Sequence, residues 1–492
     1  MTIYRSILTK SSAYSLSLLI GRLVGLLLMP VYTRALSTAD YGILELLDLT
    51  LNVFSVLVAM QLGESLIYFY SMSKTDEDRN AATSTAILTS LGVGVVGIGA
   101  LLGTSLSGPM SRLVFGSPEY TSLFYLAFLN LGFSVSVETA MSWFRARNQA
   151  TRYAVLANGR IIVSAILNVV FLIGFRMGVA SIQWSSLIAA GTLTIALSAL
   201  ILRQTGLTFS ISFFKQQFRF AAPFSVSGLF MLMLHYGDRF FLKRTVSLSE
   251  IGIYSVAYKF GMMISMVQTP FSLYWTSQVF TVVREENGAR IYVRVFTYLC
   301  LVVNLAVLVI SLFIQPVIYF MAAPAFRIAA IYVPLIALAY VFRSLGDFPR
   351  SVLNVEKKTS KYITINASGG VTCMVLYAIL IPRFGVWGAV IATVVGFFVY
   401  MIVSHVVVQR VRRFELQYGR CIHLLMCTLI CVGVNTWLNP QGFWLQTGVG
   451  LLLFLAWWLM LAGTAFFDEA ERRMVGEALS GLRKRLSVAA GA

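Results

Sequence analysis

Positively charged side chains inside long apolar runs are the residues of this sequence with the clearest chemistry. Arg22, Arg160 and Lys259 each lie well inside such a run, and Arg22 has no acidic residue within one helical turn. An ionised side chain at the centre of a membrane costs about 3 kcal/mol on the insertion scale, so each needs a counter-charge or water. Arginine binds phosphate through a bidentate fork and lysine binds it as a point charge. We therefore expect these three side chains to hold a phosphate-bearing substrate in a central cavity.

Acidic side chains inside other apolar runs leave a second interpretation open. Glu64 and Glu138 lie in such runs, where either can pair across helices with the buried bases. Both are also candidates, together with Asp347, for coupling acids that bind a proton or Na⁺ reversibly. Arg343, Asp347 and Arg350 fall on one face of a predicted helix, because they are four and three residues apart. This group predicts either a self-contained network around Asp347 or, through Arg343, a further contact to the substrate.

Four other charged residues lie close to the ends of their apolar runs. Asp238 and Arg239 come near the end of one run, and Glu45 and Asp48 come near the start of another. Charged side chains at the ends of membrane helices reach water at the interface. We expect these four residues to be interfacial.

A twelve-residue segment occurs twice and divides the chain into two related halves. Residues 33–44 read TRALSTADYGIL, and residues 243–254 read KRTVSLSEIGIY. At an offset of 210 residues the identical or similar pairs are Arg34 and Arg244, Ser37 and Ser247, Asp40 and Glu250, Gly42 and Gly252, and Ile43 and Ile253. The series Arg176, Gly178 and Val179 recurs as Arg383, Gly385 and Val386 at an offset of 207. Each segment alone is also typical of an interfacial corner with a helix-starting acid, but that does not account for two nearly equal offsets.

The composition indicates a helical membrane protein. Of the 492 residues, 58% are hydrophobic and only 12% are charged, whereas soluble domains carry about 25% charged residues. Apolar runs long enough to cross a bilayer recur along the whole chain, and in lipid such runs must be helices. The net charge of +18 does not indicate nucleic-acid binding, because the basic residues lie singly or in small groups between the runs.

Fourteen membrane spans are predicted, in two lobes of six with an appended pair. Their approximate bounds are 11–34, 41–70, 82–104, 119–146, 152–175, 180–203, 216–242, 250–282, 290–314, 326–354, 361–381, 387–409, 418–438 and 442–466. The first lobe covers 1–203, and a linker covers 204–219. The second lobe covers 220–412, although its first span starts near 216. The appended pair covers 413–466, and a basic tail covers 467–492. The repeats begin an even number of spans apart, so the lobes should be related by an axis along the membrane normal.

Most lysines and arginines fall on one set of alternate connections, together with the tail. Such connections are cytoplasmic by the positive-inside rule, so both termini are expected in the cytoplasm. The five cysteines lie in or beside apolar runs without a CxxC pair, and we expect them to pack in the core. The sequence offers no catalytic or metal-ligand pattern and no phosphate-binding glycine loop, so we expect a protein that is not an enzyme and has no cofactor.

The repeated segment and two later motifs resemble bacterial polysaccharide flippases of the Wzx type. The matching stretches are Leu36 to Leu44 with Leu62-Gly63, Ala222-Pro223, Asp238 to Leu242 (DRFFL), Glu250 to Ser255 (EIGIYS) and Ile381 to Ala389 (IPRFGVWGA). The resemblance covers about residues 1 to 410, and the last two spans match in number alone. Arg34, Asp40, Gly42, Asp238, Arg239, Glu250 and Gly252 are the motif residues expected to have a structural role.

This family belongs to the multidrug/oligosaccharidyl-lipid/polysaccharide exporter superfamily. The resemblance implies a V-shaped pair of lobes with alternating access, in a bacterial inner membrane. It implies that undecaprenyl-pyrophosphate-linked sugars move between leaflets for O-antigen, capsule or exopolysaccharide synthesis. In that case Arg22, Arg160 and Lys259 would hold the pyrophosphate and sugar while the lipid tail stays among membrane lipids. Polysaccharide polymerase and chain-length proteins are the partners that such a pathway offers.

Three other functions remain open from the sequence. A drug or cation antiporter of the same superfamily needs unpaired deep acids, whereas this chain places unpaired bases there. A membrane polymerase or ligase usually needs a large outer loop, and the connections here are short. A scaffold within a synthesis complex would need no binding cavity.

Overall fold

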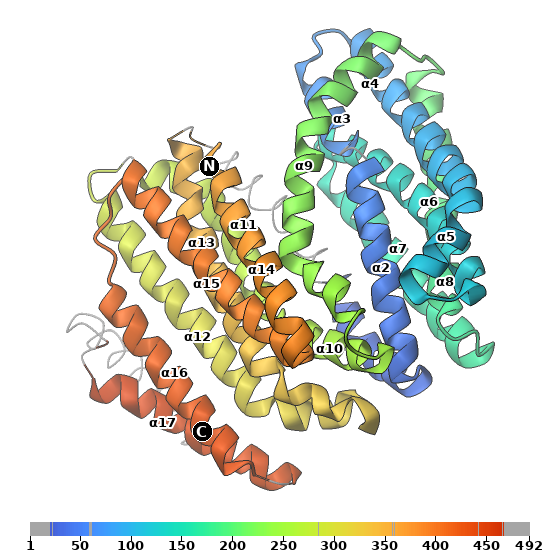
Figure 1. Cartoon of the computed structure of the whole chain (residues 1–492). Helices are drawn as coiled ribbons and strands as arrows, with labels where there is room; N and C mark the ends of the chain where they lie inside the picture. Colours follow the sequence, from blue (N-terminus) through green and yellow to red (C-terminus); the bar gives the residue numbers. More distant parts are fainter. Residues whose placement is uncertain are drawn as a thin grey trace, which may run out of the picture.

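The protein is a bundle of helices arranged as two lobes that meet at one end (Figure 1). The computed structural model describes residues 20–21, 23–58, 62–283, 285–356, 358, 360–440, 442–464 and 466. Every regular element within these ranges is a helix. Nine of the described helices are long and apolar enough to cross a membrane, or ten if one bent pair is a single span. The predicted all-α polytopic class is therefore confirmed.

The first lobe contains the helices that precede residue 206. They are Leu23–Ala35, α2 (Thr38–Val58), α3 (Leu62–Met72), α4 (Asp76–Thr89), η1 (Ser90–Leu102), α5 (Gly103–Phe115), η2 (Pro118–Tyr120), α6 (Thr121–Ala146), α7 (Ala150–Val169), η3 (Val170–Gly174) and α8 (Ala180–Thr205). The π-helical η1 joins α4 and α5 into one continuous span. Several predicted spans are thus built from consecutive helical pieces.

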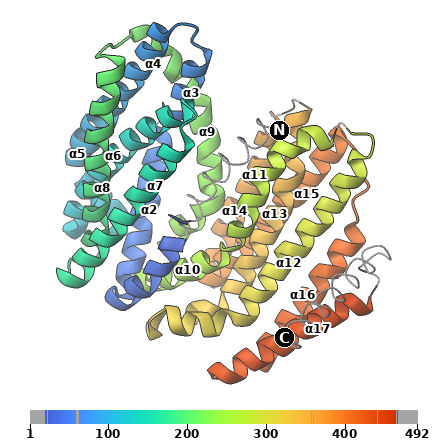
Figure 2. The same cartoon turned by 180° about the vertical axis from the view of Figure 1, so that it is seen from behind.

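The second lobe repeats this plan. It contains α9 (Ile211–Leu242), α10 (Leu248–Gly261), α11 (Ile264–Val282), α12 (Gly288–Met321), η4 (Pro324–Ile331), α13 (Val333–Val355), α14 (Lys361–Phe384) and α15 (Val386–Val411). The appended pair is α16 (Tyr418–Leu438) and α17 (Phe443–Gly463), which lies beside α12 on the side away from the first lobe (Figure 2). The predicted tail, 467–492, falls outside the described residues.

Helix α9 connects the two lobes. It begins at Ile211, within the stretch expected as a linker, and its first turns lie on the first lobe. There the Gln217 amide donates to the Ala82 carbonyl at 2.9 Å, and the Ser210 amide donates to Thr85 Oγ1 at 3.0 Å. Farther along, α9 packs against α14 of the second lobe and α2 of the first.

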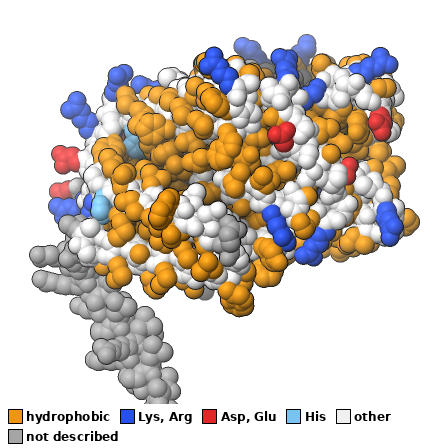
Figure 3. All heavy atoms as spheres, turned by 60° about the horizontal axis from the view of Figure 1, so that its bottom comes forward, with side chains coloured by type: hydrophobic (Ala, Val, Ile, Leu, Met, Phe, Trp, Pro, Cys, Tyr) orange, Lys and Arg blue, Asp and Glu red, His pale blue; other side chains and the backbone are white. Residues whose placement is uncertain are grey.

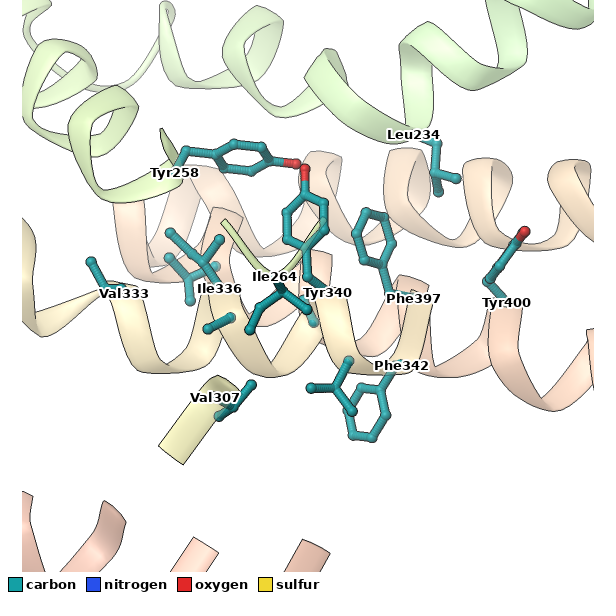
Figure 4. Packing of buried hydrophobic residues seen from close by; sticks show 14 of the residues in the cluster. Leu234, Tyr258, Ile264, Val307, Val333, Ile336, Tyr340, Phe342, Phe397 and Tyr400 are labelled. Carbon is teal, nitrogen blue, oxygen red and sulfur yellow. The ribbon is translucent and has the colours of Figure 1, made fainter. Parts of the chain in front are cut away.

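Buried aliphatic and aromatic side chains hold the second lobe together (Figure 4). Ile264 of α11 and Ile336 of α13 are completely buried, and Phe397 of α15 packs edge-on against Tyr340 of α13. The rings of Tyr258 and Tyr340 lie 5.9 Å apart, with their hydroxyls directed toward each other. Membrane lipid supplies no hydrophobic drive between helices, so such close packing is what associates them.

The face of the molecule drawn in Figure 3 is largely apolar, as expected of a protein that lies in lipid. In the view of Figure 3, hydrophobic side chains cover most of the face and lysines and arginines gather at its edges. Trp437 and Trp444, near the turn between α16 and α17, are each 83% exposed. Tryptophan at a helix end is typical of the membrane–water interface.

Candidate functional site

The two copies of the repeated segment start two helices in the same way. Ser37 precedes α2 and Ser247 precedes α10, and each hydroxyl accepts a backbone N–H three residues later. In return, the carboxylates of Asp40 and Glu250 each accept the serine amide at 3.0 Å. These reciprocal bonds form a capping box, which fixes the first turn of a helix. Asp40 and Glu250 are therefore helix-starting acids, as is typical of such a segment when it is considered alone.

The glycines of the repeat have a different role, because they bring the two helices into contact. A Cβ atom on Gly42 would lie 2.0 Å from the Leu248 carbonyl oxygen, and one on Gly252 would lie 2.0 Å from that of Thr38. Only glycine permits such close crossing of two backbones. The two copies thus pack against each other across the lobes. We call the contact between residues 33–45 and residues 239–259 the lobe junction.

Polar contacts between the lobes surround this crossing. The hydroxyls of Thr38 and Ser249 are 2.6 Å apart, and the Arg34 guanidinium donates to the Phe320 carbonyl at 3.2 Å. Lys243 of the second lobe donates to the Leu113 carbonyl of the first. In this structure the lobes are therefore closed at the junction end. The other end, where α3 meets α4 and where α9 begins, carries the connections expected in the cytoplasm (Figure 1).

A buried ion cluster lies directly behind the crossing. Asp238 is 0% exposed and Arg239 is 1% exposed, so the prediction that they are interfacial is wrong. The Arg239 guanidinium donates to Asp238 at 2.9 Å and, across the lobes, to Glu45 at 3.1 Å. Its carbon also lies 4.3 Å from the centre of the Tyr258 ring. Glu45 is likewise mostly buried, at 12% exposure, whereas Asp48 is exposed.

Lys259 belongs to the same cluster. Its ammonium donates to the Tyr41 hydroxyl at 3.0 Å, lies 4.5 Å from that ring and lies 4.0 Å from Glu45. The prediction that Lys259 has no counter-charge is therefore wrong. The lysine remains 42% exposed, so water shares its solvation.

A cavity that contains a predicted site residue lies within the first lobe. It has a volume of about 810 Å³ and is lined by residues of the first helix, α6, α7 and α8. Arg160 of α7 lines it, and its guanidinium donates to Ser134 at 3.1 Å and contacts Glu138 of α6 at 3.5 Å. The prediction that Arg160 is unpaired is also wrong, and the alternative pairing with Glu138 is correct.

A second arginine enters this cavity beside the first. Arg145 of α6 donates to Glu64 of α3 at 3.2 Å and to Ser142 at 2.7 Å. Glu138 and Arg145 also line a smaller cavity of about 290 Å³ that contains Glu64. The side chains of Glu138 and Glu64 are 69% and 49% exposed, whereas those of Arg160 and Arg145 are 24% and 34% exposed.

Arg343, Asp347 and Arg350 form the self-contained network that their spacing allowed. Asp347 accepts hydrogen bonds from Arg350 at 2.9 Å and from Tyr400 at 2.5 Å, and it lies 3.5 Å from the Arg343 guanidinium. Gln268 of α11 donates to the same carboxylate at 3.2 Å. The three elements α11, α13 and α15 are thus joined by one partly buried carboxylate.

The structure does not bring the predicted substrate-binding residues into one described cavity. Arg160 lies in the first lobe, Lys259 at the lobe junction and Arg343 in the second lobe. Arg22 is outside the described residues, although its neighbours Gly21 and Val24 line the same cavity as Arg160.

The sequence reasoning did not identify Arg145 or Tyr41 as members of these sites. Arg145 is one of the basic residues near a connection that is expected in the cytoplasm, yet it follows Glu138 by seven residues and so shares its helix face. Tyr41 lies within the repeated segment, beside Gly42. Spacing along the chain could have identified Arg145 and Tyr41 as candidates. It could not have identified their partners Glu64 and Lys259, because these lie on other helices.

Comparison with known proteins gives both a family and a fold. Residues 7–273 match the family described as "Polysaccharide biosynthesis protein". An uncharacterized membrane protein of Haemophilus influenzae is 23% identical over 269 residues, which are 53% of this chain and 62% of that protein, less than two-thirds of its length.

Two solved structures share the fold at low identity. The structure of lipid II flippase MurJ in an inward closed conformation is 14% identical, with a TM-score of 0.72 over 92% of this chain and 98% of that one. An inward-facing multidrug resistance MATE family transporter of the MOP superfamily is also 14% identical, with a TM-score of 0.67 over 80% of this chain and 96% of that one. The family match covers more than half of the chain and agrees with the resemblance seen in its motifs, so this chain belongs to the polysaccharide biosynthesis protein family, with the fold of the flippases and multidrug transporters of the MOP superfamily.

Proposed function

We propose that this protein is a flippase that moves undecaprenyl-pyrophosphate-linked oligosaccharides across the bacterial inner membrane. The observation that carries the proposal is the cavity of about 810 Å³ containing Arg145 and Arg160. A guanidinium has five N–H donors, and each of these arginines uses its donors on one carboxylate and one serine. Donors therefore remain for a phosphate, which arginine binds bidentately.

The position of the closed end supports a direction for this transport. If the end rich in lysine and arginine is cytoplasmic, the junction closes the outer side. A substrate made in the inner leaflet would then enter from the cytoplasmic side. Opening the junction while the other end closes would release it outside, and no covalent bond need form or break.

Transport of a lipid-linked sugar by the purified protein tests the proposal. Proteoliposomes containing the whole chain would be loaded with a fluorescent undecaprenyl-pyrophosphate oligosaccharide, and its appearance in the other leaflet would be measured with a membrane-impermeant quencher. Arg160→Gln should slow the exchange at least tenfold, because the variant loses a charge-assisted bond to phosphate. Arg203→Gln, an exposed arginine at the end of α8, is the control and should change nothing. Equal rates in wild-type and protein-free vesicles would overturn the proposal.

A cation antiporter remains the second candidate, because the acids of the cavity are more exposed than its arginines. Glu138 is 69% exposed beside an Arg160 side chain that is 24% exposed. An exposed carboxylate inside a membrane protein is a candidate cation or proton site. Glu138→Gln separates the two functions: it should abolish uptake of a cationic drug by an antiporter, whereas a flippase should retain binding of the pyrophosphate. Drug uptake that depends on Glu138, with no effect of Arg160→Gln on lipid-linked sugar, would favour the antiporter.

A further inference from the structure

A basic cavity lies outside the lobe junction and outside the first-lobe cavity. It has a volume of about 500 Å³ and is formed by the last turns of α15, the connection that follows and the start of α16. The residues that line it are His405, Val406, Gln409, Arg410, Val411, Arg413 and Tyr418. Helix α15 begins near Val246, beside the lobe junction, so its last turns lie at the opposite, basic end (Figure 1).

The connection between α15 and α16 is held in a fixed shape. The Gln409 amide donates to the Phe414 carbonyl at 2.8 Å, and the Phe414 amide donates back to Gln409 at 2.9 Å. The Phe414 ring stacks on Tyr292 of α12, with 4.1 Å between centroids. The backbone beside Arg413 is therefore held in place by these contacts, so Arg413 does not lie on a free loop.

Two arginines of this cavity have no partner among the described residues. Arg410 and Arg413 are exposed, and no ion pair or hydrogen bond joins their side chains to any residue that the structure describes. Arg412, between them, is instead bound to Glu356 at 3.3 Å and to the Val283 carbonyl at 2.7 Å. Glu415, the acid of this connection, is exposed. Two like charges that line one cavity repel each other, and an anion between them would relieve that repulsion.

His405 adds a polar atom that is buried and unsatisfied. The residue is 8% exposed, and its Nδ1 lies 2.9 Å from the Met401 carbonyl. That nitrogen must carry the proton, since a carbonyl only accepts, so Nε2 of the neutral ring is an acceptor. Nε2 has no partner among the described residues. The ring is held between Phe296 and Tyr418, at 5.5 Å and 5.9 Å between centroids.

We propose that this cavity binds the headgroup of an anionic phospholipid that carries hydroxyl groups, such as phosphatidylglycerol. The phosphodiester would lie between Arg410 and Arg413. A headgroup hydroxyl would donate to His405 Nε2, which the headgroup would first have to uncover because this atom has almost no exposed surface in the structure. Basic pockets between membrane helices on the cytoplasmic side are places where anionic headgroups bind. The alternative is that Arg410 and Arg413 only set the orientation of the chain in the membrane. That role needs no cavity, and it does not account for the buried Nε2 of His405, which has no hydrogen-bond partner among the described residues.

A lipid in this position would connect the appended helix pair to the second lobe. Helix α16 packs mainly on α12 and α17, and its contact with α15 is slight. The headgroup would bridge Arg410 at the end of α15 and Tyr418 at the start of α16. Bound lipid should therefore stabilise the folded chain in detergent, as any ligand of the native state does.

Native mass spectrometry of the whole chain in detergent tests the proposal, with phosphatidylglycerol, phosphatidylcholine and inorganic phosphate as separate probes. Phosphatidylglycerol should bind most tightly and raise the unfolding temperature. Arg410→Gln with Arg413→Gln should weaken its binding about tenfold or more, since each basic residue near an anionic lipid contributes about fivefold. The matched control is Arg203→Gln with Arg219→Gln, which changes two exposed arginines elsewhere in the chain and should leave binding unchanged.

A second variant tests the role of the histidine. His405→Phe keeps a ring between Phe296 and Tyr418 but removes the acceptor, so it should bind phosphatidylglycerol no better than phosphatidic acid, which lacks the glycerol hydroxyls. The proposal is overturned if phosphatidylcholine binds as tightly as phosphatidylglycerol, or if the control pair loses as much binding as the Arg410 and Arg413 pair. Equally tight binding of inorganic phosphate, displaced by neither lipid, would mean that the cavity is a site for the free ion and not for a headgroup.

Discussion

Gly42 and Gly252 occupy equivalent places in the two copies of the repeat, and they meet across the lobes. A Cβ on Gly252 would lie 3.0 Å from the Gly42 amide nitrogen as well as 2.0 Å from the Thr38 carbonyl oxygen. The neighbouring atoms are backbone, so a methyl group cannot be accommodated by rotating a side chain. The repeated segment is therefore the surface by which the lobes close on each other.

Gly42→Ala should open the lobe junction without unfolding the protein. The added methyl group must push α2 and α10 apart, and overpacking of this kind costs about 1–3 kcal/mol. That energy is lost only in the closed state, so the population should shift toward an open junction. Spin labels on the two lobes should report a longer distance at this end. Gly191→Ala, at a mid-helix glycine of α8 with no neighbour within 4 Å, should leave the distance as it is.

A disulfide placed across the junction should stop transport reversibly. The Thr38 and Ser249 hydroxyl oxygens are 2.6 Å apart, so cysteines at both positions should be able to bond in the closed state. With the native cysteines replaced, Thr38→Cys with Ser249→Cys should form a cross-link on oxidation and lose flipping activity. Reduction should restore that activity. Either single cysteine variant should remain active after oxidation, and full activity of the cross-linked pair would mean that the junction does not open during transport.

The existence of this junction could be predicted from the sequence only in part. The repeat predicted two related lobes and the Ser37 and Asp40 spacing predicted a helix start, because both depend on residues close together in the chain. That Gly42 faces Gly252 could not be predicted, since the pattern is equally consistent with two corners at the same side of the membrane that do not touch. The sequence did contain one signal of a close contact, which is the glycine at the same place in both copies. Neither Gly42 nor Gly252 has a positive φ angle that would require glycine.

Arg239→Met should destabilise the fold. The variant leaves Asp238 buried without its cation and removes the cation from the rings of Tyr254 and Tyr258, 5.3 Å and 4.3 Å away. Breaking a buried ion pair by removing one partner costs about 3–5 kcal/mol. The unfolding temperature in detergent should fall by several degrees. Arg383→Met, at an exposed arginine that ends α14, should unfold as the wild type does, and an equally stable Arg239→Met would show that the pair between Arg239 and Asp238 does not stabilise the fold.

The charges inside the membrane were the least predictable part of the site. Spacing along one helix correctly grouped Arg343 with Asp347, because their geometry is local. Arg239 with Glu45 and Arg160 with Glu138 are pairs between different helices, and sequence alone does not say which faces meet. Arg160 therefore appeared to lack a counter-charge when it was read only against its own helix.

Glu45→Gln should weaken closure while leaving the fold nearly intact. Arg239 keeps its bond to Asp238 at 2.9 Å on its own helix. Lys259 loses its counter-charge at 4.0 Å but is 42% exposed, so neither cation is left buried without an acid. Across the lobes the variant loses this contact and the charge-assisted bond from Arg239 at 3.1 Å, and hydrogen bonds to charged groups contribute about 1.5–3 kcal/mol. This equals at least a tenfold shift toward the open junction. Maleimide should label Ser249→Cys faster in the Glu45→Gln background, whereas the unfolding temperature should change much less than in Arg239→Met. If labelling is no faster, the contact between Glu45 and Arg239 does not hold the lobes together, and the glycine crossing alone closes this end.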